Sequence, residues 1–274
     1  MKKKLKKTQF YESHFLKDNS IVIIILARLE SKRLKNKAIL KVNDNTIIEI
    51  LIKRLKKKFN PNNIILCTSY KKKNLYLKKF CKENEIKFFR GSDKNIFQRI
   101  ISCQNKFKFK HFVRVTGDNP FTDLIAIEKL SKNHIKNDND YTYTSSLPIG
   151  TRPEIFSMES LKRCSKIAVD KCSSEYLTYF FKRSIFKIEN CLLKKYFKDQ
   201  EKYNISIDNK KDFILLKKII EKNKNFNFDF KNLVKMLMKY SNPVKLEKKN
   251  KKIRLLTKKY DVRFRNNIAN NILS

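Results

Sequence analysis

The sequence is poor in glycine, lacks tryptophan and has no long apolar run. Only 3 of its 274 residues are glycine and 5 are proline. The longest apolar run, IVIIILA at residues 21–27, is much shorter than the ~20 residues that a membrane helix needs, and no small-residue cleavage site follows it. The sequence therefore predicts neither a membrane span nor a secretion signal, and we expect a cytoplasmic protein.

Cysteine is scattered rather than clustered. None of the 6 cysteines belongs to a C-x-x-C pair, the spacing that is typical of zinc and redox sites. Isolated thiols in a cytoplasmic protein are usually reduced core residues.

Acidic residues are few compared with basic ones. The chain has 26 Asp and Glu against 65 Lys and Arg, a formal net charge of +39. Such a charge is typical either of nucleic-acid or membrane binding or of compositional drift toward Lys, Asn, Ile and Phe. Lysine is spread over all helix-like segments, and no zinc-finger, RNA-recognition or basic-zipper pattern occurs. We therefore favour drift and expect no specific nucleic-acid partner, although polyphosphates and nucleic acid should be attracted nonspecifically.

The chain divides into three segments by pattern. Residues 1–19 are polar and lack a clear period, so they form a basic extension. Residues 20–242 carry the apolar periodicity of one domain, and residues 243–274 are a Lys- and Asn-rich tail.

Strands and helices alternate in the first part of the domain. The expected strands are 21–27, 63–69, 86–90 and 111–116. The expected helices are 46–58, opened by a Thr46–Glu49 capping box, a Lys-rich segment to about residue 84, a helix capped by Ser92 or Asp93, and 123–135. This alternation predicts an α/β fold with a mostly parallel, mixed sheet covered by helices on both faces.

The pattern is looser after residue 136. Strands are expected at 140–145 and 203–208, with a loop at 147–156 between them. Helices are expected at 157–169, 174–183, 210–222 and 230–240.

Cations are concentrated in the loop that follows the first strand, RLESKRLKNK. Ligands bind at the carboxyl ends of strands in open α/β sheets, and several cations there suit a triphosphate, which Arg can contact in a bidentate manner. These residues are Arg28, Lys32, Arg33, Lys35 and Lys37. A solvated Lys-rich loop is the alternative, because the whole chain is basic.

Two carboxylates occupy other expected strand ends. Asp118 follows Gly117, which allows a tight backbone turn, and Asp208 ends the late strand. One or two carboxylates with substrate phosphates and water suit Mg²⁺. Each aspartate could instead form an Asx turn or a helix cap.

Taken together, these motifs resemble the cytidylyltransferases of the acylneuraminate and 3-deoxy-manno-octulosonate type, above all the branch named for spore-coat polysaccharide biosynthesis. The first loop matches R-x-x-S-x-R-L-P-x-K, and VRVTGDNP matches VR-x-T-G-D-x-P. All 3 glycines lie inside the matching motifs. The other matches are Arg90-Gly91, Asp140-Tyr141, Pro148 with Gly150 and Glu154, Glu175–Thr178, and Asp208 with Asp212.

The resemblance implies a Rossmann-like, GT-A type fold and transfer of CMP from CTP to a sugar, with release of pyrophosphate. It implies Mg²⁺ as cofactor, and it allows a homodimer because relatives commonly dimerise. It assigns catalysis to Arg28, Lys37 and Asp118, and the metal to Asp118 and Asp208. It assigns the nucleotide to Arg28, Ser31, Arg33, Lys37, Arg90, Gly91, Thr116 and Gly117. It places Glu154, Glu175 and Arg152 on the sugar side.

The chain departs from the family pattern at four places. In the first loop, Leu29 replaces a small residue and Lys35-Asn36 replaces a Pro-Gly. The phosphate loop is therefore not built on glycine. Tyr176 replaces a histidine. Arg152 replaces an acidic residue, which suggests a more anionic sugar.

Two other functions fit parts of this pattern. One is a related transferase that uses another nucleotide, or a glycosyltransferase; the latter is favoured by D-x-D, and GDNP lacks the second aspartate. The other is a basic binding protein that has lost catalysis, which would bind polyanions in a salt-sensitive way without turnover.

Overall fold

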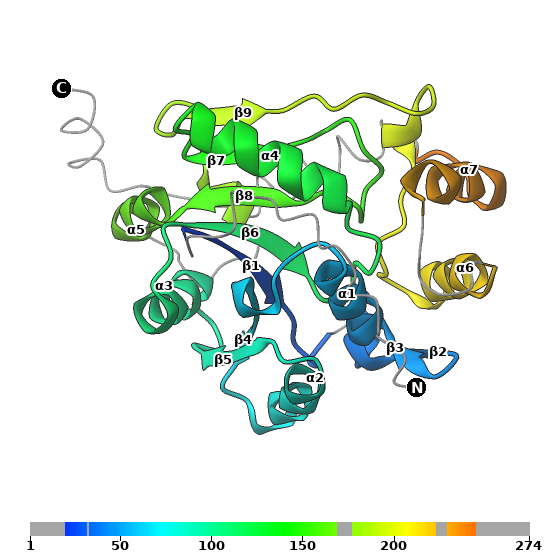
Figure 1. Cartoon of the computed structure of the whole chain (residues 1–274), viewed down its shortest axis with the longest axis horizontal. Helices are drawn as coiled ribbons and strands as arrows, with labels where there is room; N and C mark the ends of the chain where they lie inside the picture. The colour runs from blue at the N-terminus through cyan, green and yellow to red at the C-terminus, as the bar shows by residue number, and fades with distance from the viewer. Residues whose placement is uncertain (1–19, 32, 169–176, 223–228, 245–274) are drawn as a thin grey trace, which may run out of the picture.

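The computed structural model describes residues 20–31, 33–168, 177–222 and 229–244. The predicted extension 1–19 and residues 245–274 of the predicted tail lie outside these ranges. A seven-stranded mixed sheet of order β5-β4-β1-β6-β8-β7-β9 forms the centre of the fold (Figure 1). Its strands are β1 (Ile21–Leu26), β4 (Ile64–Ser69), β5 (Lys87–Gly91), β6 (His111–Thr116), β7 (Tyr141–Tyr143), β8 (Glu154–Ser157) and β9 (Ile188–Asn190).

The sheet is mostly parallel, as predicted. β1 pairs in parallel with β4 and β6, β4 with β5, and β7 with β9, whereas β8 runs antiparallel to both β6 and β7. Leu26 is in register with both Cys67 and Thr116, and Ser69 with Gly91. The loops that leave β1, β4, β5 and β6 therefore share one edge of the sheet.

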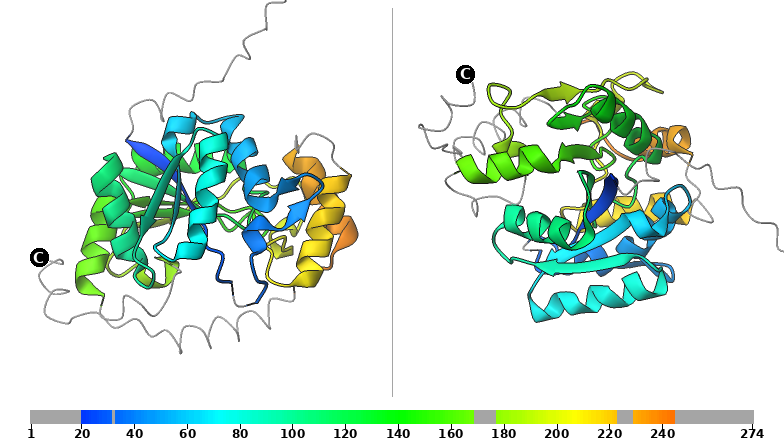
Figure 2. Two further views of the ribbon diagram at one scale, coloured as in Figure 1. Left: turned by 90° about the horizontal axis from the view of Figure 1, so that it is seen from below. Right: turned by 60° about the vertical axis from the view of Figure 1, so that its left-hand side comes forward.

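Helices cover both faces. The α-helices are α1 (Ile47–Lys56), α2 (Leu77–Glu83), α3 (Ile96–Phe107), α4 (Leu124–Lys136), α5 (Met158–Ile167), α6 (Lys210–Glu221) and α7 (Phe230–Tyr240). Apolar residues of α3 and α5 pack in one core cluster, and those of α1, α2, α4, α6 and α7 in another. Figure 2 (left) shows α3 and α5 on one side of the sheet, and α6 and α7 on the other. A two-stranded hairpin of β2 (Lys41–Val42) and β3 (Asn45–Thr46) leads into α1.

Helix caps explain where most helices begin. Thr46 and Glu49 form the predicted capping box of α1. The predicted cap of α3 is wrong, because its N-cap is Asn95 and not Ser92 or Asp93. β5 extends to Gly91, and Ser92 Oγ then accepts a bond from the Asn95 backbone N at 3.2 Å, so the chain turns before the helix starts.

Three of the later predictions are wrong. Residues 203–208 form one isolated bridge, Asn204 with Ile149, and no strand, since the Asn204 side chain bonds locally to Ser206 and competes with a strand ladder. The predicted loop 147–156 contains most of β8, whose Ile155 and Phe156 are fully buried. In the predicted helix 174–183, residues 174–176 lie outside the described ranges, and Leu177–Phe180 forms a 3-10 helix.

Candidate active site

Four predicted residues meet at the edge where β1 and β6 end. Lys37 Nζ contacts Asp118 Oδ2, lies 3.7 Å from Asp208 Oδ1 and donates to the Ile207 carbonyl at 2.8 Å. Arg33 Nη1 lies 2.9 Å from Asp208 Oδ2. We call Arg33, Lys37, Asp118 and Asp208 the strand-edge cluster. The first loop, the β6 turn and the segment before α6 each contribute to it, so distant parts of the chain build one site.

Neither aspartate of the cluster is a helix cap. Asn209 caps α6 in a capping box with Asp212, and Asp123 caps α4 by accepting from two backbone N–H groups. The carboxylates of Asp118 and Asp208 instead face cationic side chains. Helix capping is therefore excluded for both aspartates, and their role as metal ligands stays a prediction.

Gly117 is required by packing in the same turn. Its backbone N donates to the Leu26 carbonyl at 2.9 Å, and a Cβ at this position would lie 2.7 Å from the Ala27 Cβ. Thr116 Oγ1 accepts from the Asn119 side-chain amide at 2.7 Å. The turn is therefore held tightly against the end of β1, which places Asp118 beside the first loop.

Arg54 of α1 bonds to the turn that follows β6. This residue was not identified from the sequence. Its guanidinium, in a residue only 5% exposed, donates to the carbonyls of Pro120 and Thr122, the second at 3.2 Å. Burial lowers its pKa to about 10, and the negative charge of Asp123 opposes this shift. The available signal was an arginine on the buried face of α1, where the other residues are aliphatic.

The other predicted residues of the first loop differ in exposure. Arg28 is exposed, Ser31 is half-buried, and Lys35 is exposed; Lys32 lies outside the described residues. Arg28 and Ser31 lie on the loop that contributes Arg33 and Lys37 to the cluster.

Arg90 and Gly91 lie farther along the same sheet edge, at the end of β5. Arg90 donates to the Tyr70 carbonyl, and its guanidinium carbon is 5.9 Å from the centre of the Tyr70 ring. Gly91 is buried, and a Cβ there would lie 2.8 Å from Arg99 Cγ. The strand order puts β4 and β1 between these residues and β6, so Arg90 and Gly91 line the edge without joining the strand-edge cluster.

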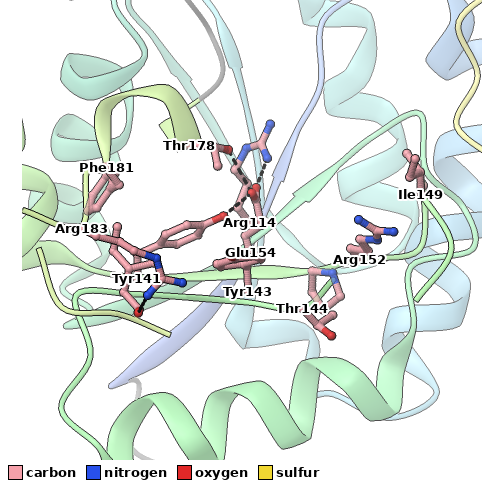
Figure 3. Close-up of a pocket in the computed structure, with 13 residues that line it drawn as sticks. Arg114, Tyr141, Tyr143, Thr144, Ile149, Arg152, Glu154, Thr178, Phe181 and Arg183 are labelled. Carbon is pink, nitrogen blue, oxygen red and sulfur yellow. Dashed lines mark hydrogen bonds and ion pairs between the residues drawn. The ribbon is translucent and has the colours of Figure 1, made fainter. Parts of the chain in front are cut away.

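A pocket of about 480 Å³ opens over β7 and β8 (Figure 3). Glu154 is at its centre, where it pairs with Arg114 and accepts from Tyr141 Oη at 2.7 Å and from Thr178 Oγ1 at 3.0 Å. Burial and the Glu154 carboxylate raise the pKa of Tyr141. The Glu154 charge is thus neutralised and its orientation fixed.

Two further arginines line this pocket. Arg152 donates to the carbonyls of Leu147 at 2.6 Å and Glu201 at 3.0 Å, and burial lowers its pKa to about 10. Arg183 donates to the Ile188 carbonyl at 2.9 Å. Figure 3 shows the two on opposite sides of Glu154. Of the predicted sugar-side residues, Glu154 and Arg152 therefore line one pocket, and Glu175 lies outside the described residues.

The strand-edge cluster has donors that suit Mg²⁺. Asp118 and Asp208 are contacted by one ammonium group, Lys37, so their oxygens already face a shared cation, and carboxylate oxygens are preferred Mg²⁺ ligands. Within the described ranges, no group of three or more His, Cys, Asp or Glu side chains is placed to hold a metal. Any metal here would therefore need ligands from substrate phosphates or water in addition to the two carboxylates.

The chain is similar to known proteins over most of its length. The family model described as cytidylyltransferase matches residues 22–250. The uncharacterized protein MJ1063 of Methanocaldococcus jannaschii is 34% identical over 224 residues, which are 80% of this chain and 90% of that protein. The spore coat polysaccharide biosynthesis protein SpsF of Bacillus subtilis is 26% identical over 211 residues, 74% of this chain and 88% of that protein.

Solved structures share the fold. A cytidylyltransferase from Leptospira borgpetersenii superposes with a TM-score of 0.74 at 22% identity, covering 82% of this chain and 99% of that one. A CMP:2-keto-3-deoxy-manno-octonic acid synthetase in complex with CTP gives a TM-score of 0.52 at 11% identity, covering 74% and 99%. In the described part of the chain, no helix is both long and apolar enough to cross a membrane.

Proposed function

The chain belongs to the cytidylyltransferase family, and we propose that this nucleotidyltransferase transfers CMP from CTP to a hydroxyl of an acidic sugar, releasing pyrophosphate, in the synthesis of a surface polysaccharide. The observation that supports the reaction is the strand-edge cluster, in which two cations and two carboxylates from three chain segments converge. The name of the B. subtilis relative, which refers to spore coat polysaccharide biosynthesis, supports the polysaccharide role.

The reaction needs cations around the triphosphate. The sugar oxygen forms a bond to the α-phosphorus while the bond from that phosphorus to the bridging oxygen of pyrophosphate breaks, and the hydroxyl proton leaves. Negative charge grows on the bridging oxygen, where positive groups stabilise it. We assign this role to Arg28, Arg33 and Lys37, whose loop follows β1.

Asp118 and Asp208 would hold Mg²⁺ together with the nucleotide phosphates. When bound, Mg²⁺ supplies a Lewis acid that neutralises phosphate charge. The aspartates themselves keep Lys37 and Arg33 at this edge, since both cations pair with them. Lys37 is thereby held within reach of the site where the triphosphate would lie.

The pocket at Glu154 would bind the sugar. Arg114 and Glu154 cancel each other's charge, whereas Arg152 and Arg183 bond to backbone carbonyls, and among the described residues neither forms an ion pair with a carboxylate. The pocket wall thus carries two positive charges that are not directly paired with a carboxylate, although the nearby Glu201 charge raises the pKa of Arg152 against the effect of burial. A carboxylate on the sugar would complement them, and this favours an acidic over a neutral sugar.

A pyrophosphate-release assay tests the proposal. CTP, UTP, GTP and ATP are each combined with Mg²⁺ and a panel of acidic, amino and neutral sugars. We expect release with CTP and an acidic sugar. If none of the four nucleotides gives pyrophosphate, nucleotidyl transfer is contradicted. If pyrophosphate is released only with neutral sugars, the acidic acceptor is contradicted but the transfer reaction is not.

Asp118→Asn tests the assignment of the site. It removes the charge and keeps the size, so turnover should fall by roughly 10²-fold or more, the scale of losing one electrostatic group of a transition state. Asp229→Asn is the matched control, because Asp229 caps α7 by accepting from the Lys231 backbone N and lies outside the cluster. That control should keep its turnover, since asparagine caps a helix about as well as aspartate; equal turnover in both variants would refute the role of Asp118.

A further inference from the structure

We propose that Asn74 is a positioning residue that fixes the first loop for nucleotide binding, an inference that rests on the proposed function. Asn74 lies in η4 (Lys72–Tyr76), the 3-10 helix that follows β4. It is fully buried at 0% exposure. A buried amide in a short connecting helix must have its polar atoms satisfied, and those of Asn74 are satisfied by the start of the first loop and the end of β4.

The side-chain amide of Asn74 joins three groups. Its Oδ1 accepts from the Leu29 backbone N at 2.9 Å. Its Nδ2 donates to Ser69 Oγ at 2.7 Å and to Glu30 Oε2 at 3.2 Å. Both amide protons are therefore used, and the backbone donor at Leu29 fixes which end of the amide faces the loop. One side chain thus ties the residues after β1 to the strand beside it.

The tie matters because the first loop contains no glycine between residues 28 and 37. Its shape is set by anchors at its two ends. At the far end Lys37 is held by Asp118 and the Ile207 carbonyl, and at the near end Leu29, only 2% exposed, is held by Asn74. Arg28, the cation next to Leu29, is oriented by the same backbone.

Loss of Asn74 should therefore act on the nucleotide without any direct contact to it. The Leu29 N–H would be left buried and unpaired, and the loop would move to reach another acceptor. A displacement of about 1 Å in a binding group can cost ~10²-fold. We expect Asn74→Leu to weaken CTP binding by about tenfold or more.

Two measurements test this role, and neither needs the sugar. Titration calorimetry with CTP and Mg²⁺ gives the affinity, and hydrogen exchange read at the Leu29 amide reports on the loop itself. Asn84→Leu is the matched control, because Asn84 is also buried, at 7% exposure, and donates to the Phe80 carbonyl at 2.9 Å at the end of α2. Both variants should lose stability, but only Asn74→Leu should speed hydrogen exchange at the Leu29 amide and lower the affinity for CTP.

A second variant separates the contacts. Asn74→Asp keeps the acceptor for Leu29 and loses both donors, so Leu29 should stay protected while CTP affinity falls below the wild type. This variant also serves if Asn74→Leu does not fold. Equal CTP affinity in the wild type and both Asn74 variants would overturn the positioning role, as would an equal loss in Asn84→Leu. A wild-type protein that exchanges slowly at Leu29 but binds no nucleoside triphosphate would instead refute the proposed function.

Discussion

Gly117 and Asp118 are neighbours at the end of β6, and each occupies its place for a different physical reason. Gly117 lies so close to Ala27 that a Cβ would come within 2.7 Å of the Ala27 Cβ, closer than two methyl groups pack. Asp118 projects from the turn and contacts Lys37. The glycine therefore sets how near the turn approaches β1, and this approach determines where the carboxylate meets the first loop.

Gly117→Ala should lower the free energy of unfolding by roughly 1–3 kcal/mol, the usual cost of overpacking. The Gly117 backbone is outside the positive-φ region, so the cost comes from the collision and not from the dihedral angles. The double variant Gly117→Ala with Ala27→Gly removes the collision. In chemical denaturation, the Gly117→Ala change should cost less in the Ala27→Gly background than in the wild type.

An additive result in this double-mutant cycle would mean that contacts other than Ala27 require the glycine. Ile48 Cδ1, 3.3 Å from the same Cβ position, is the next neighbour. The cycle measures packing alone and does not depend on any bound nucleotide.

Residue types at strand ends could be predicted, but partner geometry could not. The concentration of cations after β1 and the two aspartates after later segments pointed to one site, and Arg33, Lys37, Asp118 and Asp208 do meet. Arg54 and Asn74 were missed: Arg54 was marked by its place on the apolar face of α1, but that place does not name its partners, and Asn74 carried no pattern of its own. Their roles come from carbonyl and amide partners far away in the sequence.

At the scale of elements, the long and strongly patterned segments were predicted well. β1 and β4 are buried runs, β6 alternates buried with half-buried residues over most of its length, and α1 and α7 have clear amphipathic periods with caps. Among the short strands, β7 confirms the strand predicted at 140–145, whereas β8 and β9 were missed. β8 exists because it pairs with β6 and β7, and β9 because it pairs with β7, and local periodicity does not contain this long-range pairing.

His134 connects three of these elements in the interior. It is fully buried on α4, with Nε2 3.2 Å from His111 Nδ1 on β6 and Nδ1 2.9 Å from Thr142 Oγ1 on β7. Burial lowers its pKa to about 3, and His111 adds to this effect while Glu189 opposes it. The folded protein thus keeps this imidazole neutral in moderately acidic solution.

The low pKa predicts an acid-sensitive contact. An unfolded chain protonates histidine near pH 6.5, whereas the folded chain does not do so until about pH 3. The stabilising contribution is therefore complete above about pH 6.5 and is lost progressively as the pH falls toward 3, by about 1.4 kcal/mol per pH unit at most.

Denaturation of the wild type and His134→Gln between pH 7 and pH 4 checks this. Glutamine can still bond to Thr142 and does not titrate, so the variant should be less stable at pH 7 and should lose less stability on acidification. Aspartates and glutamates contribute to both proteins, and the difference between the two curves isolates the histidine. Parallel curves would show that His134 does not titrate on unfolding.

At the scale of the whole molecule, excess positive charge is spread and not gathered. Lys or Arg occurs in each of the helices α1 to α7, on both sides of the sheet. Some of this charge is paired in the strand-edge cluster and at Arg114 and Glu154. Most of it has no acidic counterpart in the chain, because 65 basic residues face 26 acidic ones.

This distribution predicts nonspecific attraction of polyanions without a dedicated nucleic-acid site. Two DNA duplexes of equal length and unrelated sequence should bind with equal affinity. Binding should weaken by ~10³-fold or more between 50 and 200 mM salt if about six or more phosphates are contacted. Fluorescence anisotropy at several salt concentrations measures both quantities. Pyrophosphate release from CTP, assayed at 200 mM salt with and without DNA, should be the same, because the proposed reaction would depend on the cations paired with Asp118 and Asp208 and not on the diffuse surface charge. A duplex preference that persists at high salt would require a defined binding surface, and charge spread by composition alone would then no longer account for the basicity of this chain.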